Sequence, residues 1–223
     1  MIYTFYDDVG AELITLKGEL FKYLIKVTRH KTDDILSFRD KREPDIIYRY
    51  KILSIDGRSA SLELQSSETY IVAADKKLHI GWCIIDPKSI EKVLPMLNES
   101  GVSQITFITC KRTQKNFKLD FKRFDRLLEA SSQQCGRSEK MMFSTCKDVE
   151  EFLHRYPHTA VFDFGGKYRE KYSDIETVLI GCEGGFTEQE RKLFDTNLLF
   201  SFKTAMILRS ESAVVAISNK ILL

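Results

Sequence analysis

From residue 76 to the end of the chain, short apolar segments alternate with segments whose apolar residues recur at helical spacing. The apolar segments are residues 78–85, 104–109, 160–164, 178–180 and 197–202. Between them, Ile90, Val93, Leu94 and Leu97 form one face of a helix that Pro87 opens. Further helices are expected from Phe121 onward, after residue 187, and over residues 210–222. Strands that alternate with helices are typical of an α/β fold, a parallel sheet with helices on both faces.

Residues 1–71 follow a different pattern, which predicts a separate domain. Four short strands are expected at residues 12–16, 35–38, 46–55 and 60–64, with turn signals such as Asp56-Gly57 between them. Phe21, Leu24 and Ile25 lie at helical spacing. The sequence therefore predicts a small β-barrel with one short helix at 1–71, and an α/β domain at 72–223.

Composition excludes several classes of protein. Hydrophobic residues make up 43% of the chain and charged residues 30%, which predicts a buried core. The formal net charge is only +2, so a nucleic-acid surface has to come from local clustering of cations. No apolar run approaches the roughly 18 residues of a membrane span, and the first residues lack the features of a signal peptide. We expect a cytoplasmic protein with no membrane partner.

The cysteines and histidines do not predict a metal site. The five cysteines form no C-x-x-C pair, and their odd number does not support a disulfide framework. His154 and His158 are four residues apart, but Pro157 between them argues against a single helical face. We expect free thiols in a reducing compartment and no bound metal.

Residues 180–187, Ile-Gly-Cys-Glu-Gly-Gly-Phe-Thr, read as the end of a strand, a glycine turn and the start of a helix. Gly181, Gly184 and Gly185 allow positive φ and close approach of a ligand to the backbone. Thr187 and Glu190 have the spacing of a capping box. A helix N-terminus behind such a turn offers N–H groups to a polar ligand. On its own, this motif favours an ordinary tight connection between strand and helix.

A second motif, Met-Ile-Leu-Arg-Ser-Glu-Ser-Ala at residues 206–213, precedes the last helix. Ser210 is a suitable N-cap, and Glu211 suits the positive end of the helix. Arg209 taken alone is an ordinary solvated arginine. Together, the two motifs resemble the "GPEGG(F/L)" and "LG-x-RILR-x-ETA" signatures of the ribosomal RNA small subunit methyltransferase E family, which belongs to the SPOUT superfamily.

Other segments resemble the same family, in the same order along the chain. Residues 99–102 resemble its "ELGV", residues 134–137 its "EQCGR" and residues 23–29 its "H-x-x-x-VLR", and Arg112 stands where the family has an arginine. Four positions depart from the family pattern: Met96, Cys182, Thr204 and Met206.

The resemblance implies S-adenosylmethionine-dependent methylation of N3 of a uridine in 16S rRNA of the small ribosomal subunit. It also implies a PUA-like barrel at residues 1–71, a SPOUT domain with a C-terminal trefoil knot at residues 72–223, and a homodimer. The cofactor would be held by three segments, through Phe164, Gly165, Gly181, Glu183, Gly184, Gly185, Phe202, Ile207, Leu208 and Ser210.

The chemistry of the implied reaction assigns two further roles. N3 of uracil has to lose a proton, so negative charge develops on the base. Arg209 is the expected catalytic group, because a guanidinium donates two parallel hydrogen bonds to an anion. Glu183 is a candidate general base by residue type, with holding the loop or the dimer partner as the alternative.

RNA contacts are expected from clustered cations. Residues 111–126 carry seven lysines and arginines against two aspartates, although part of this run is the wet face of a helix. The residues expected to contact RNA are Arg29, Lys111, Arg112, Lys115 and Arg137.

Three other functions stay open from the sequence alone. One is another SPOUT enzyme that methylates a ribose 2′-hydroxyl, and a second is a non-catalytic RNA-binding relative. A third is a phosphate-cradling nucleotide enzyme, but the chain has neither G-x-x-x-x-G-K-[ST] nor G-x-G-x-x-G at the glycine turn.

Overall fold

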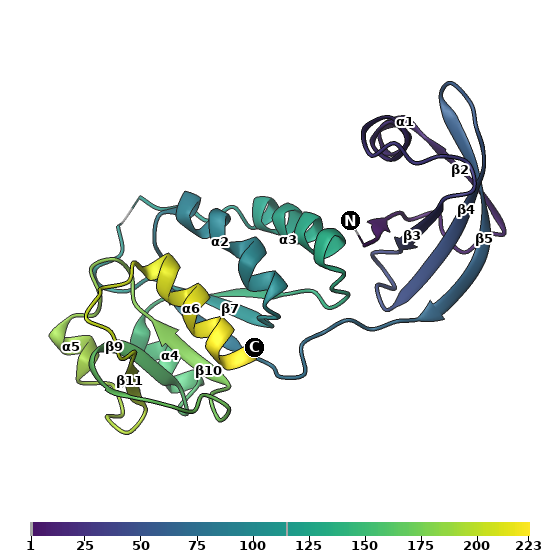
Figure 1. Cartoon of the computed structure of the whole chain (residues 1–223). Coiled ribbons are helices and arrows are strands. Elements are labelled where there is room, and N and C mark those ends of the chain that lie inside the picture. Colours follow the sequence, from purple (N-terminus) through teal and green to yellow (C-terminus); the bar gives the residue numbers. More distant parts are fainter. Residues whose placement is uncertain (1, 115) are drawn as a thin grey trace. The chain divides into compact units, whose positions relative to one another are not determined.

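The computed structural model describes residues 2–114 and 116–223, and the chain divides into two compact units (Figure 1). The first comprises residues 1–73 and 132–139, and the second residues 74–131 and 140–223. The first unit thus includes a short segment that lies beyond the sequence-based boundary at residue 72.

The first unit is built on a five-stranded sheet with the strand order β1-β3-β4-β5-β2. Its strands are β1 (Thr4–Phe5), β2 (Leu13–Lys17), β3 (Ile35–Arg39), β4 (Ile46–Ile55) and β5 (Ser59–Thr69). β1 pairs with β3 in parallel, and the other pairs are antiparallel. The four predicted strands are confirmed. The two-residue β1 was not predicted, because it is too short to show an alternating pattern.

A short helical segment covers the core of this sheet. α1 (Gly18–Phe21) continues into one π-helical segment, η1 (Lys22–Val27), in agreement with the predicted helix. Phe21, Leu24 and Ile25 are buried among the inward-facing side chains of the strands. This face of the helix forms because its apolar residues are spaced three or four apart.

The second unit is built on a six-stranded, all-parallel sheet with the order β11-β9-β10-β6-β7-β8. The strands are β6 (His79–Cys83), β7 (Gln104–Ile108), β8 (Met142–Cys146), β9 (Ala160–Tyr168), β10 (Thr177–Ile180) and β11 (Leu199–Ser201). The predicted parallel α/β fold is confirmed. β8 was not predicted, since at this sheet edge Met142 is 58% exposed and the strand has no continuous apolar run.

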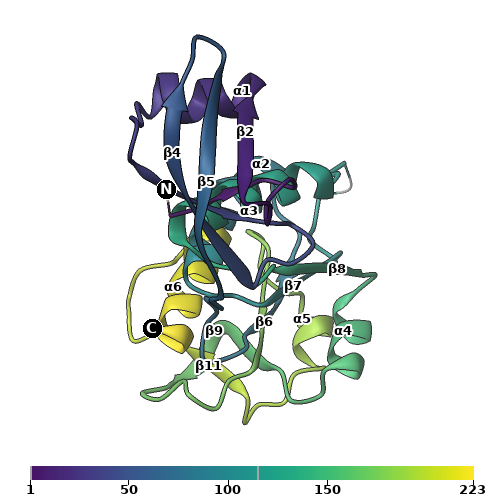
Figure 2. The same ribbon diagram turned by 90° about the vertical axis from the view of Figure 1, so that its right-hand side faces the viewer.

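Helices cover both faces of this sheet. They are α2 (Pro87–Glu99), α3 (Phe121–Cys135), α4 (Val149–Arg155), α5 (Glu188–Arg191) and α6 (Ser210–Leu222). α2 and α6 pack side by side on one face, and α4 lies on the other (Figures 1 and 2). Gly81 and Trp82, neighbours in the middle of β6, face opposite sides of the sheet. A Cβ on Gly81 would lie 2.3 Å from the Phe152 ring of α4, whereas Trp82 bonds to Ser210 of α6.

The parallel arrangement places the carboxyl ends of all six strands at one edge of the sheet. Ligands of open α/β sheets bind at this edge, where neighbouring connections lead away in different directions. β10 is inserted between β6 and β9, so the glycine turn that follows it lies among loops from distant parts of the sequence. Within the described residues, the structure contains no helix long and apolar enough to cross a membrane.

Candidate functional site

A cavity of about 330 Å³ opens at the carboxyl ends of β9, β10 and β11. Three segments line it: residues 162–165 of β9, residues 180–186 at the glycine turn, and residues 201–213 leading into α6. These are the three segments that the sequence motifs single out.

Most of the residues expected to hold a cofactor lie in the wall of this cavity. They are Phe164, Gly165, Gly181, Glu183, Gly185, Phe202, Ile207, Leu208 and Ser210. Arg209, the expected catalytic residue, lines the cavity as well. The structure brings Gly184 to the glycine turn but not to the cavity wall.

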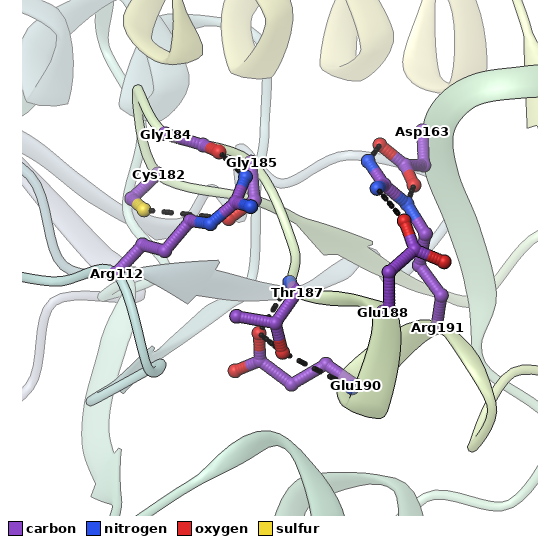
Figure 3. Close-up of polar contacts among 9 residues, drawn as sticks. All are labelled: Arg112, Asp163, Cys182, Gly184, Gly185, Thr187, Glu188, Glu190 and Arg191. Atoms are coloured by element: carbon purple, nitrogen blue, oxygen red, sulfur yellow. Dashed lines mark hydrogen bonds and ion pairs between the residues drawn. The ribbon is translucent and has the colours of Figure 1, made fainter.

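The glycine turn is held in its tight conformation by its own backbone and by Arg112. Gly185 has φ +64°, and its N–H donates to the Cys182 carbonyl at 2.9 Å. The Arg112 guanidinium donates to the Gly184 carbonyl (Figure 3). A Cβ on Gly184 would lie 3.2 Å from Arg112 side-chain atoms, so this glycine faces Arg112. A larger residue at position 184 would require the Arg112 side chain to shift by a few tenths of an ångström, whereas the positive φ of the turn is at Gly185.

Ser210 joins the glycine turn to the start of α6. Its hydroxyl accepts a hydrogen bond from the Trp82 indole at 2.8 Å and donates to the Gly181 carbonyl at 2.5 Å. The prediction that Ser210 caps the helix is wrong, because Arg209 occupies the N-cap position and Ser210 is the first helical residue. The hydroxyl instead accepts from the buried Trp82 N–H and so connects α6 with β6.

The helix after the glycine turn begins with the predicted capping box. Thr187 Oγ1 accepts from the Glu190 N–H at 3.2 Å, and Glu190 accepts from the Thr187 N–H at 2.8 Å (Figure 3). Glu190 is only 5% exposed, and its second oxygen accepts from the Lys111 N–H at 2.9 Å. One buried carboxylate therefore connects α5 with the loop that follows β7.

An ion pair that sequence reasoning missed closes the same region. Arg191 of α5 donates from Nε and Nη2 to the two oxygens of Asp163 at 2.6 and 3.2 Å (Figure 3). Asp163 lines the cavity and is 7% exposed, and its hydrogen bond raises the pKa of Arg191. The available signal was a lone carboxylate inside the apolar strand at residues 160–164, because a buried charge requires a partner.

β9 differs from its prediction at its carboxyl end. The apolar segment predicted to end at residue 164 continues as a strand through Gly165-Gly166 to Tyr168, because β11 pairs with it. A Cβ on Gly166 would lie 2.3 Å from the Phe200 carbonyl carbon, and Ser201 Oγ donates to the Gly166 carbonyl at 2.7 Å. Two backbones approach here as closely as only glycine permits.

The two residues expected to be catalytic are both accessible from solvent. The Arg209 side chain is 83% exposed, and its Nη1 lies 4.0 Å from Glu211 Oε1. Glu183 is exposed on the glycine turn and lines the cavity. A solvated guanidinium at the cavity wall is free to turn toward an anionic group there.

The expected RNA-binding residues fall into separate places. Lys111 and Arg112 are exposed on the loop that Glu190 and the Gly184 carbonyl hold. Arg29 is exposed in the first unit, with φ +62°. Arg137 is 4% exposed and pairs with Glu139 at 3.3 Å, so its guanidinium does not present a surface to phosphate. Lys115 lies outside the described residues.

The second unit belongs to a known class of domain by comparison with other proteins. The RNA methyltransferase domain family matches residues 73–222. Among the described residues, no cluster of three histidine, cysteine or acidic side chains is arranged to hold a metal ion.

Curated proteins and solved structures agree with that match. The chain is 33% and 34% identical to ribosomal RNA small subunit methyltransferase E from two strains of Helicobacter pylori, with 98% of each chain covered. The fold resembles a Neisseria gonorrhoeae protein of the same name bound to S-adenosyl methionine (TM-score 0.73, 17% identity, 98% and 95% covered). It also resembles a putative methyltransferase from Legionella pneumophila in complex with SAM (TM-score 0.72, 20% identity, 97% and 94% covered). The chain therefore belongs to the ribosomal RNA small subunit methyltransferase E family.

Proposed function

We propose that this protein transfers a methyl group from S-adenosylmethionine to N3 of a uridine in 16S rRNA. The observation that carries the proposal is that the glycine turn and Arg209 line the same cavity. Family membership supplies the reaction class, and the cavity wall supplies residues that suit it.

The cavity fits a nucleoside-sized cofactor by volume and by chemistry. Small-molecule pockets typically measure about 300–1,000 Å³ and combine apolar walls with a few placed polar groups. Here Phe164, Phe202 and Leu208 supply apolar surface, and the glycine turn supplies backbone N–H and C=O groups. S-adenosylmethionine, when bound, supplies an electrophilic methyl group. The residues of the cavity wall would hold this cofactor and orient its methyl group.

Arg209 would act on the other reactant. A uracil whose N3 has lost its proton carries negative charge on its carbonyl oxygens, and a guanidinium can donate to that charge. Arg209 lies at the cavity wall in the N-cap position of α6, whose free N–H groups favour an anion in the same place. Glu183, exposed on the glycine turn at the cavity wall, would be the candidate by residue type to accept the N3 proton, with holding the turn as its other role.

The RNA would approach over the loop that follows β7. Lys111 and Arg112 are exposed there, and their backbone and guanidinium contacts attach this loop to the glycine turn. Phosphate contacts from such cations position an RNA without reading its sequence. The target base has to be unstacked, because N3 lies on the pairing edge of uracil. Binding should weaken steeply with rising salt.

We further infer a PUA-like barrel for the first unit, a trefoil knot in the second, a homodimer, and action in the cytoplasm on the small ribosomal subunit. The support for these four inferences is the family resemblance of the motifs.

Nucleoside mass spectrometry of 16S rRNA from a strain that lacks this protein tests the proposal. We expect 3-methyluridine to disappear, and to return when the wild-type chain is supplied but not when Arg209→Ala is supplied. Undiminished 3-methyluridine in the deletion strain would reject the proposed target. Loss of a ribose-methylated nucleoside instead would identify the 2′-hydroxyl enzyme. Normal RNA modification together with no cofactor binding in calorimetry would identify a non-catalytic relative.

A further inference from the structure

Three neighbouring parallel strands of the second unit end in cysteines. Cys83 is the last residue of β6, Cys110 follows β7 and Cys182 follows β10, and β6 lies between the other two strands. All three thiols are free and buried. The cysteine that departs from the family pattern, Cys182, is therefore not isolated. It completes a cluster beneath the glycine turn.

Cys110 and Cys182 are the pair in closest contact. Their Sγ atoms lie 3.3 Å apart, and Cys110 Sγ is also 3.2 Å from the Thr113 hydroxyl. Cys182 lies in the cavity wall with its Sγ 3.8 Å from the Gly185 carbonyl (Figure 3). Cys110 and Cys182 retain 4% and 6% exposure, while Cys83 has none. Cys182 lines the cavity, so a small oxidant there meets this side of the pair, and Cys110 Sγ lies 3.3 Å from Cys182 Sγ.

We propose that Cys110 and Cys182 form a reversible disulfide on exposure to a peroxide, and that this disulfide closes the cavity to its ligand. The part of the proposal that concerns S-adenosylmethionine rests on the proposed function.

The chemistry of the two thiols indicates how this disulfide would form. Hydrogen bonding with Cys182, and then with Cys83 and Thr113, lowers the pKa of Cys110, whereas the same contact raises the pKa of Cys182. Thiolates are the nucleophiles in thiol oxidation. The Thr113 hydroxyl at 3.2 Å and Cys182 Sγ at 3.3 Å would stabilise a thiolate on Cys110, which would then react first. It attacks one peroxide oxygen, the O–O bond breaks, and a hydroxide leaves to become water. The Cys182 sulfur then attacks the sulfenic sulfur of Cys110, the S–O bond breaks, and a second water leaves with the Cys182 proton.

The disulfide would change the shape of the cavity wall. An S–S bond is about 2.05 Å long, so the two sulfurs would have to approach by roughly 1.2 Å from their 3.3 Å separation. Cys182 belongs to the glycine turn that lines the cavity, so closing this distance would pull that turn against its contact with Arg112. The turn would move with Cys182 and take Gly181 and Gly185 away from the positions that line the cavity.

Treatment of the full-length reduced protein with hydrogen peroxide tests the pair directly. We expect the intact mass to fall by two hydrogen atoms, a tryptic peptide that joins Cys110 to Cys182, and reversal by dithiothreitol. Cys110→Ser and Cys182→Ser should each abolish the joined peptide. Cys135→Ser should retain it, because Cys135 lies outside the cluster on α3. Absence of the joined peptide, or a Cys83–Cys110 link in its place, would overturn the proposal.

Calorimetry with S-adenosylmethionine then separates the switch from the proposed function. The oxidised protein should bind on the order of tenfold or more weakly than the reduced protein, since misplacement of a site by about 1 Å is costly. Equal affinity of the oxidised and the reduced protein for S-adenosylmethionine would overturn the proposal that the disulfide closes the cavity, although the disulfide itself would stand. If the reduced protein itself does not bind, the proposed function fails, and the joined peptide still decides whether the pair is oxidised.

Discussion

Ser210 shows how a single hydroxyl can hold two distant segments of the chain together. It accepts from Trp82 on β6 and donates to Gly181 at the start of the glycine turn, and it is 6% exposed. A buried donor and a buried acceptor are both satisfied through this one side chain. The wall of the cavity therefore depends on a residue whose local sequence suggests only a helix cap.

Ser210→Ala should destabilise the protein and loosen the glycine turn. The change leaves the Trp82 N–H and the Gly181 carbonyl without their partner, and an unsatisfied buried group costs about 1–3 kcal/mol. Urea unfolding followed by tryptophan fluorescence measures this loss at the only tryptophan of the chain. Ser212→Ala, an exposed change on the same helix, is the matched control. Equal unfolding midpoints for the two variants would show that the Ser210 contacts contribute nothing.

Arg209→Ala should leave cofactor affinity close to that of the wild type and reduce turnover. The side chain is 83% exposed and makes only a 4.0 Å contact with Glu211, so its removal should not disturb folding. Loss of one preorganised donor to a developing anion typically lowers the rate on the order of 10²–10³-fold. Methyl incorporation into small subunits and calorimetry with S-adenosylmethionine measure the two quantities. A turnover equal to that of wild type would remove Arg209 from the mechanism.

Among the secondary-structure elements, α5 has a role out of proportion to its four residues. Its capping box places Glu190 where one carboxylate accepts from Thr187 and from the Lys111 N–H. Its Arg191 binds Asp163 on β9. The short helix thus connects the glycine turn, the loop after β7 and the strand that forms the opposite cavity wall.

Glu190→Gln should weaken the attachment of the loop after β7 to α5. The amide has one acceptor oxygen where the carboxylate has two, so its NH₂ group would face a backbone donor. We expect a loss of about 1–3 kcal/mol in unfolding free energy, together with weaker RNA binding. Thermal unfolding and RNA titration at several salt concentrations measure both. Glu188→Gln is the control, because that side chain is 86% exposed on the same helix. Equal stability and equal RNA affinity of Glu190→Gln and Glu188→Gln would contradict the role of Glu190 in holding the loop.

The elements that sequence patterns predict best are those buried on both faces. The strands at residues 104–108 and 177–180 are mostly apolar, because helices cover both faces there. The glycine turn and its capping box are equally local and were predicted. β8 has an interrupted apolar pattern, and the extension of β9 depends on its pairing with β11. The Asp163–Arg191 pair joins residues 28 positions apart and exists only once the chain has folded.

At the scale of the whole molecule, His79 makes folding stability depend on pH. Its Nε2 lies 2.7 Å from Thr106 Oγ1, and its ring packs 4.4 Å from that of Tyr156. Burial lowers the pKa of His79 from 6.5 to about 4. The unfolded chain binds a proton near pH 6.5 and the folded chain only near pH 4. The contribution of neutral His79 to folding stability is therefore complete above pH 6.5, and it is lost as the pH falls from 6.5 toward 4.

Between pH 6.5 and pH 4, the wild type should lose more stability than His79→Gln. Glutamine keeps a hydrogen-bonding group beside Thr106 but takes up no proton in this range. Urea midpoints measured in steps across the range give the difference between the two proteins, in which the shared carboxylates cancel. Parallel curves would show that His79 is protonated in the folded protein as readily as in the unfolded one.

The chain passes between the two units three times, at residues 73–74, 131–132 and 139–140. Residues 132–139 depend on the N-terminal segment, since the Ile2 N–H donates to the Gln133 carbonyl and the Tyr3 hydroxyl to the Arg137 carbonyl. A single genetic crossover therefore cannot exchange one unit for that of another protein. Any recombinant that inherits a foreign N-terminus also needs a matching stretch of eight residues, more than fifty positions downstream, and the two segments are bound to evolve together.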